Sequence, residues 1–109
     1  MPMVDFPEKD WKLFRKRIVE WQEAYMDKLC KEYVGILSES GSSAERFWTI
    51  EKRIKVDKRK VGVNAEMRRS MMYGNILALI QEGAITLEDL DGFSDELRQA
   101  VESSTRRQA

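Results

Sequence analysis

The sequence of 109 residues contains no histidine and a single cysteine, Cys30. Without histidine the commonest general base at neutral pH is missing, so an enzyme would need a carboxylate or lysine with a strongly shifted pKa. The usual zinc sites also cannot be assembled from one cysteine and no histidine. We therefore predict a protein without catalytic activity, bound metal or cofactor. We expect Cys30 to be an unpaired, buried residue in a reducing compartment.

Proline and long apolar runs are equally scarce. Pro2 and Pro7 are the only prolines, so no proline interrupts a helix in the rest of the chain. The longest central apolar run, residues 76–80, is far shorter than the roughly 18 to 20 residues that cross a bilayer. Because the N-terminus also lacks a signal-like apolar stretch, we expect no membrane segment and a cytoplasmic location.

Apolar residues recur every three or four positions from Trp11 to Leu37, which is the pattern of an amphipathic helix. We predict a helix over residues 6–37, opened by a capping box of Asp5 and Glu8. At roughly 48 Å it would exceed the diameter of a compact chain of this size, so it either projects or breaks near Gly35. Aromatic side chains on a projecting helix are typical of a protein interface. The predicted homodimer interface consists of Trp11, Phe14, Ile18, Trp21 and Tyr25.

A polar linker over residues 38–42 separates this helix from a second one, predicted over 43–60. Ser42 is suited to cap the start of the second helix, and Gly62 to end it in a left-handed conformation. Its predicted apolar face consists of Phe47, Ile50, Ile54 and Val61.

A third helix is predicted over 64–82, with Asn64 as its cap, Gly74 marking close helix packing and Gly83 at its end. A short fourth helix begins at Thr86, and Ser94 caps a fifth. Residues 103–109 are predicted to be a frayed tail.

These elements make an all-α fold: one long N-terminal helix, two central helices and a short C-terminal helical hairpin. We expect a single domain over residues 1–109, in which 43–102 form the helical core.

Charge is unevenly distributed, although nineteen basic and nineteen acidic residues cancel over the whole chain. Residues 52–69 include eight basic and two acidic side chains, a net charge of +6, whereas 82–102 include one basic and seven acidic, a net charge of −6. We favour pairing of the two segments inside the fold. The alternatives are that the basic segment docks an acidic protein or binds nucleic acid. Its candidate phosphate contacts are Lys52, Arg53, Lys55, Lys58, Arg59, Lys60, Arg68 and Arg69.

Several short motifs follow one another along the chain. They are Glu20-Trp21-Gln22-Glu23, Phe47-Trp48-x-x-Glu51-Lys52-Arg53-Ile54-Lys55, Gly62-Val63, Met67-x-Arg69-Ser70, Gly83-Ala84-Ile85 and Glu88-Asp89-Leu90-x-x-Phe93-Ser94-Asp95-Glu96-Leu97. In this order they resemble a family of small proteins of unknown function from low-GC Gram-positive bacteria and their mobile elements. The resemblance covers most of residues 10–101 and implies no known activity or functional residue.

Some members of that family carry the label "multidrug transporter", which disagrees with the lack of a membrane-spanning run in this sequence. The mobile-element context favours a protein that regulates or blocks another protein, or that handles nucleic acid. We therefore predict a non-enzymatic helical interaction module that self-associates through its long N-terminal helix. The alternative is a small nucleic-acid-binding regulator that uses the basic face of residues 52–69.

Overall fold

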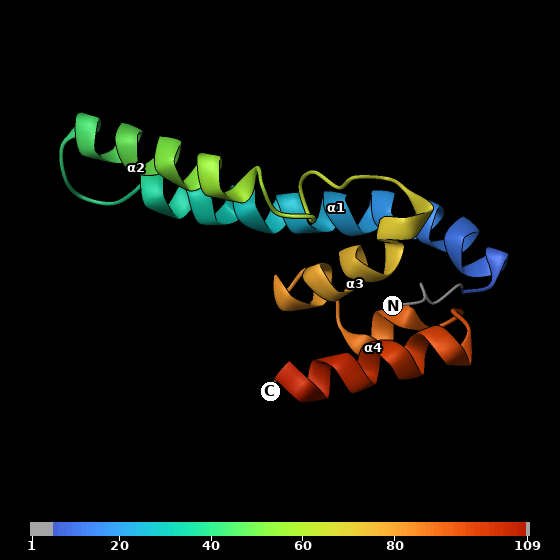
Figure 1. Ribbon diagram of the computed structural model, residues 1–109. Coiled ribbons are helices and arrows are strands. Elements are labelled where there is room, and N and C mark those ends of the chain that lie inside the picture. Colours follow the sequence, from blue (N-terminus) through green and yellow to red (C-terminus); the bar gives the residue numbers. More distant parts are fainter. Residues whose placement is uncertain (1–5, 109) are drawn as a thin grey trace.

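The computed structural model describes residues 6–108, which form helices joined by turns and contain no strand (Figure 1). This confirms the predicted all-α class. The elements in chain order are α1 (Glu8–Leu37), α2 (Ser43–Asp57), the 3-10 turn η1 (Arg69–Met71), α3 (Met72–Gln81), the 3-10 turn η2 (Leu87–Leu90) and α4 (Asp95–Gln108).

Helix α1 runs unbroken for 30 residues, through Gly35. Its length of about 45 Å accounts for most of the 52 Å long axis of the molecule. The helix therefore does not break near Gly35, and its C-terminal half projects beyond α3 and α4 (Figure 1). Pro7 occupies the position before its first turn, and the predicted cap Asp5 lies outside the described residues.

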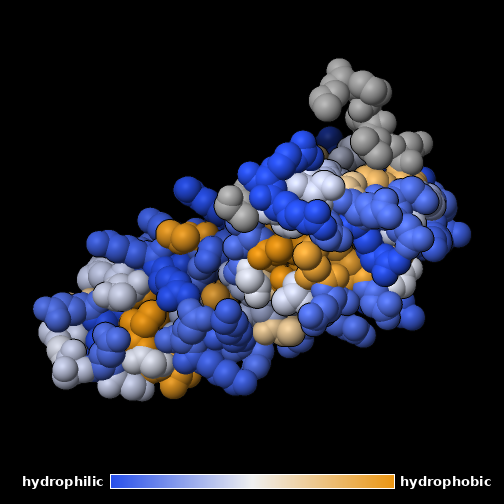
Figure 2. All heavy atoms as spheres, turned by 90° about the horizontal axis from the view of Figure 1, so that it is seen from below, coloured by the Kyte–Doolittle hydropathy of each residue, from blue (hydrophilic) through white to orange (hydrophobic). Residues whose placement is uncertain are grey.

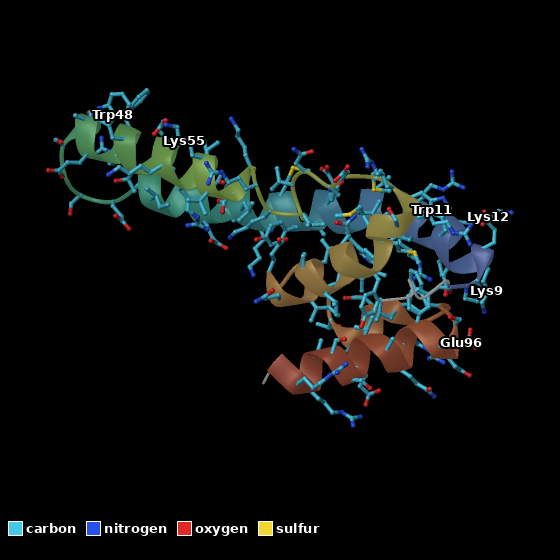
Figure 3. All side chains as sticks on the ribbon, in the orientation of Figure 1. Lys9, Trp11, Lys12, Trp48, Lys55 and Glu96 are labelled. Carbon is cyan, nitrogen blue, oxygen red and sulfur yellow. The ribbon has the colours of Figure 1, made fainter. Side chains whose placement is uncertain are left out.

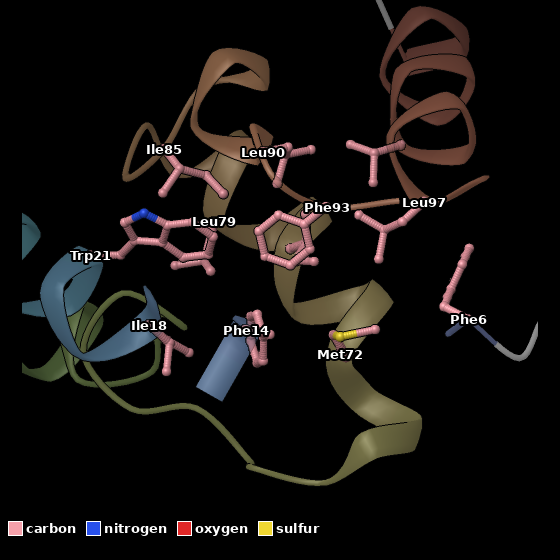
Figure 4. Packing of buried hydrophobic residues seen from close by; sticks show 12 residues of the cluster. Phe6, Phe14, Ile18, Trp21, Met72, Leu79, Ile85, Leu90, Phe93 and Leu97 are labelled. Carbon is pink, nitrogen blue, oxygen red and sulfur yellow. The ribbon is translucent and has the colours of Figure 1, made fainter. Parts of the chain in front are cut away.

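The N-terminal half of α1 packs against α3, η2 and α4, which together form the body of the molecule (Figure 4). Phe14 and Trp21 are in edge contact, and the Trp21 ring stacks on Phe93 with ring centres 6.2 Å apart. The buried apolar cluster consists of Phe6, Phe14, Ile18, Trp21, Met72, Ile76, Leu79, Ile85, Leu90, Phe93, Leu97 and Val101.

The C-terminal half of α1 extends beyond the body and is covered by α2, so the two helices form a hairpin (Figure 1). Ser42 caps α2 as predicted, because its hydroxyl accepts the Glu45 N–H at 3.1 Å. The helix ends at Asp57 and not at residue 60. The turn that follows is held from α3's end, where the Glu82 carboxylate accepts the N–H groups of Val61 (2.9 Å) and Gly62 (3.0 Å).

The predicted left-handed stop at Gly62 is wrong, since its φ is not positive. Gly62 instead lies against the ring of Tyr25, which a Cβ at this position would overlap. The prediction for α3 is also corrected: the helix begins at Met72, and residues 64–68 are irregular. Asn75 of α3 donates to the carbonyl of Glu66 at 3.0 Å and so secures this irregular segment. Asn64 therefore caps no helix.

The end of the chain is more helical than predicted. Gly83, with φ of 80°, ends α3, and Thr86 and Asp89 form a capping box around η2. Ser94 caps α4, because its hydroxyl accepts the Leu97 N–H at 3.2 Å. Helix α4 continues to Gln108. The prediction of a frayed tail from residue 103 is therefore wrong for residues 103–108, which are helical.

Candidate interaction surface

The aromatic stripe predicted as a partner interface lies inside the chain. Phe14, Ile18, Trp21 and Tyr25 are all buried, and Trp11 is half-buried. The cause is that the body packs on the face of α1 that carries Phe14, Ile18 and Trp21, while the turn at Gly62 lies against the Tyr25 ring. The predicted interface with another copy is therefore corrected: four of these side chains are core residues, and Trp11 packs against the same core.

The exposed apolar surface lies instead on the projecting hairpin. Of the ten large apolar side chains exposed in the described residues, six belong to residues 34–56: Val34, Leu37, Phe47, Trp48, Ile54 and Val56. Phe47 is 63% exposed and Trp48 58%, and their rings meet edge to face with centres 5.1 Å apart. Phe47 and Ile54 belong to the predicted apolar face of α2, and both are exposed, although Ile54 also lies beside α1.

An apolar hollow of about 220 Å³ lies between the two helices of the hairpin, beside Ile54. Its apolar lining comes from Met26, Leu29, Cys30, Ile54 and Val63, together with the ring of Tyr33. Cys30 is exposed, which corrects the expectation that it is buried. Figure 2 shows apolar residues that interrupt the hydrophilic surface of the hairpin half, and a further apolar area on the body.

A charged cluster around Asp57 joins the two helices beneath this surface. Asp57 is 2% exposed and accepts the Tyr33 hydroxyl at 2.5 Å and the Nε–H of Arg53 at 3.1 Å. Lys60 Nζ lies 3.2 Å from its other oxygen. Arg53 also pairs with Glu32 of α1 and lies over the Tyr33 ring. The cluster therefore holds α2 on α1.

Burial alone would raise the pKa of Asp57, but the hydrogen bonds from Tyr33 and Lys60 and the charge of Arg53 outweigh it and lower that pKa. Burial, and then the hydrogen bond to Asp57, raise the pKa of Tyr33 to about 12. The hydrogen bond to Asp57 also raises the pKa of Lys60. At neutral pH the cluster is thus a fixed set of opposite charges, and a carboxylate with a lowered pKa is a weak base.

The eight predicted phosphate contacts divide into two groups. Five have acidic partners: Arg53 and Lys60 in the Asp57 cluster, Lys55 with Glu51, Arg68 with Glu66, and Arg69 with Glu8. The other three, Lys52, Lys58 and Arg59, are exposed and form no ion pair within residues 6–108.

Trp48, Lys52 and Lys55 share one face of α2, because steps of four and three residues bring side chains together on a helix. Figure 3 shows Trp48 and Lys55 on the side of α2 that faces away from α1. Lys58 and Arg59 follow in the next turn. We call these five residues the α2 basic surface.

The basic segment does not pair with the acidic one. Within the described part of the chain, no side chain of 52–69 forms an ion pair with a side chain of 82–102, and the link between the segments is that of Glu82 to two backbone N–H groups. Figure 1 shows why: α2 and α4 lie on opposite sides of α1. The prediction of internal charge pairing is therefore wrong.

Comparisons of this chain with models of protein families, with curated proteins and with solved structures give no match. The resemblance of its motifs to the small Gram-positive proteins therefore stays a prediction. Residues 6–108 include no helix that combines the length and the apolar character needed to span a membrane. In the same residues no three histidine, cysteine or acidic side chains are grouped as metal ligands.

Proposed function

We propose that the protein is a non-enzymatic interaction module that binds a protein partner through the hairpin of α1 and α2. The observation that carries the proposal is the concentration of exposed apolar side chains on residues 34–56, with Phe47 and Trp48 at its centre. Exposed apolar side chains gathered in one part of a surface mark interaction sites, and tryptophan is enriched among the residues that dominate binding energy.

The construction of the hairpin supports the same function. The Asp57 cluster and the Ser42 cap hold α2 against α1, so the exposed side chains stand on a preformed scaffold. A preformed surface loses less conformational entropy when it binds. The lone cysteine is consistent with a cytoplasmic module, and the motif resemblance favours one that regulates or blocks another protein.

The test is co-purification from cells of the native organism after mild cross-linking, with wild type and two variants. Phe47→Asp places a charge in the proposed surface, and Val19→Asp places the same charge at a residue of α1 that is 66% exposed and lies outside it. We expect the partner to be lost from Phe47→Asp by at least tenfold and kept by Val19→Asp. Equal recovery with both variants would contradict the proposal.

The second candidate is a nucleic-acid-binding regulator, which the α2 basic surface favours. Exposed cations beside an exposed tryptophan suit a single strand, because phosphates pair with the cations and bases stack on the ring. Four of the eight predicted contacts support this candidate best. Lys52, Lys58 and Arg59 form no ion pair within the part of the chain that the structure describes, and Lys55 is exposed. A mobility-shift titration at low salt without any complex would remove it.

A further inference from the structure

We infer that the partner of the α2 basic surface is a second copy of this chain, which binds with the acidic surface of η2 and α4. The inference rests on the proposed function and names the partner for it. The basic and acidic segments do not pair within one molecule. In such a contact they would pair between two molecules.

The first argument is charge. Lys52, Lys58 and Arg59 are exposed cations without an ion pair in the described residues. Glu88, Asp91 and Glu96 are exposed carboxylates that likewise form no ion pair within residues 6–108. Glu88 belongs to η2, Asp91 follows η2, and Glu96 lies in the first turn of α4. Three exposed cations on one surface and three exposed carboxylates on the other can therefore pair between copies. Complementary charge of this kind steers association and selects the partner.

The second argument is shape. Trp48 is 58% exposed and lies on the same outer side of α2 as Lys55 (Figure 3), one helical turn from Lys52. Between η2 and α4 lies a hollow of about 310 Å³, lined by Leu87, Leu90, Asp95, Arg98, Gln99 and Glu102. Leu87 is itself an exposed apolar residue. An indole placed in this hollow would contact Leu87 and Leu90, and it would lie beside the carboxylates of Asp95 and Glu102 and the guanidinium of Arg98.

The third argument is position. Because α2 and α4 lie on opposite sides of α1 (Figure 1), one molecule offers its basic surface on one side and its acidic surface on the other. Two different surfaces in contact make a head-to-tail interface, which builds rings or chains of copies. The average mass should therefore rise with concentration and fall as salt screens the charges.

The experiment exchanges the charges of the two surfaces. In the first variant Lys52→Glu and Arg59→Glu make the α2 basic surface acidic. In the second, Glu88→Lys and Glu96→Lys make the η2–α4 surface basic. Each variant alone opposes like charges between copies, whereas a mixture of the two restores opposite charges at every contact. Lys12→Glu with Lys16→Glu is the control, because it changes as much charge at exposed positions of α1 outside both surfaces.

Masses are measured by light scattering and sedimentation at low salt and at about 0.15 M salt, where the Debye length is about 8 Å, with circular dichroism to verify folding. We expect wild type and the control to associate at low salt, each exchanged variant to be monomeric, and their equimolar mixture to associate again. Loss of association in Trp48→Ala would locate the contact on α2.

A wild type that stays monomeric at low salt and high concentration would overturn the inference, and so would a mixture that stays monomeric. If Phe47→Asp still loses a co-purified partner in that case, the proposed function stands and only the identity of the partner is wrong. A monomeric wild type that binds single-stranded nucleic acid, and loses it with Lys52→Glu and Arg59→Glu, would assign the surface to nucleic acid instead.

Discussion

Asp57 shows how one side chain determines the rigidity of the proposed binding surface. An ion removed from water costs several kcal/mol unless it is paired and hydrogen-bonded. Asp57 meets this condition with one partner from α1, Tyr33, and two from its own segment, Arg53 and Lys60. The spacings of four and three residues to the two cations are visible in the sequence. The contact with Tyr33 is not, because it depends on the packing of α2 on α1.

The hydrogen bond from Tyr33 to Asp57 should be measurable by its removal. We expect Tyr33→Phe to lower the free energy of unfolding by about 1.5 to 3 kcal/mol at neutral pH, the range for hydrogen bonds to charged groups. The folded-state pKa of Asp57 is lowered, so the stabilisation is present above the unfolded-state pKa of about 3.9 and is lost as pH falls through the folded-state value. Urea unfolding at neutral pH and near pH 3 tests both statements.

The difference between wild type and Tyr33→Phe should therefore shrink on acidification. An equal difference at both pH values would mean that the hydroxyl stabilises the fold without involving the charge of Asp57. Tyr73→Phe is a useful comparison, because within residues 6–108 the Tyr73 hydroxyl bonds to the Ala100 carbonyl (2.9 Å) and the Ser104 hydroxyl and to no carboxylate. Its effect should not follow the titration of Asp57.

At the scale of elements, the connection from α2 to α3 departs most from prediction. Residue type alone predicts helical caps at Asn64 and Gly62. The observed path depends on groups far away in the sequence, since Glu82 binds the backbone at 61–62 and the Tyr25 ring lies against Gly62. Glycine is needed at this position for its lack of a side chain and not for a left-handed conformation.

Two substitutions of glycine by alanine should therefore act in opposite directions. Gly62→Ala would overlap the Tyr25 ring, and we expect it to destabilise by about 1 to 3 kcal/mol, as overpacking does. Gly74→Ala lies within α3, where an added Cβ has no atom within 4 Å, and should stabilise by about 0.5 to 1 kcal/mol. Urea unfolding midpoints measure both, and a tolerated Gly62→Ala would show that the turn can move away from α1.

At the scale of the whole molecule, α1 joins a compact body to a projecting hairpin. The principal extents are 52, 28 and 24 Å, and the radius of gyration of 16.6 Å exceeds the roughly 13 Å of a compact chain of this length. A long helix covered by its own α2 needs no second chain to bury its apolar stripe. The aromatic stripe therefore gives no reason for a dimer, and a contact with another chain is expected on the outer surface of the hairpin.

Small-angle scattering can verify this shape. At about 1 M salt, where the Debye length is about 3 Å and charge-driven association is weak, we expect a radius of gyration near 16.6 Å for the monomer. The distance distribution should extend to about the 52 Å of the long axis. A radius near 13 Å would mean that the hairpin folds back on the body.

The all-α class, the long first helix and the caps at Ser42, Thr86 and Ser94 follow from the sequence by itself, because periodicity and capping depend on residues within a few positions of one another. Which apolar faces are covered, and whether opposite charges meet, was decided by the tertiary structure. Both depend on which elements pack on α1: the body and the turn at Gly62 bury the aromatic stripe, and α2 and α4 lie on opposite sides of α1 (Figure 1). No spacing along the chain encodes that placement.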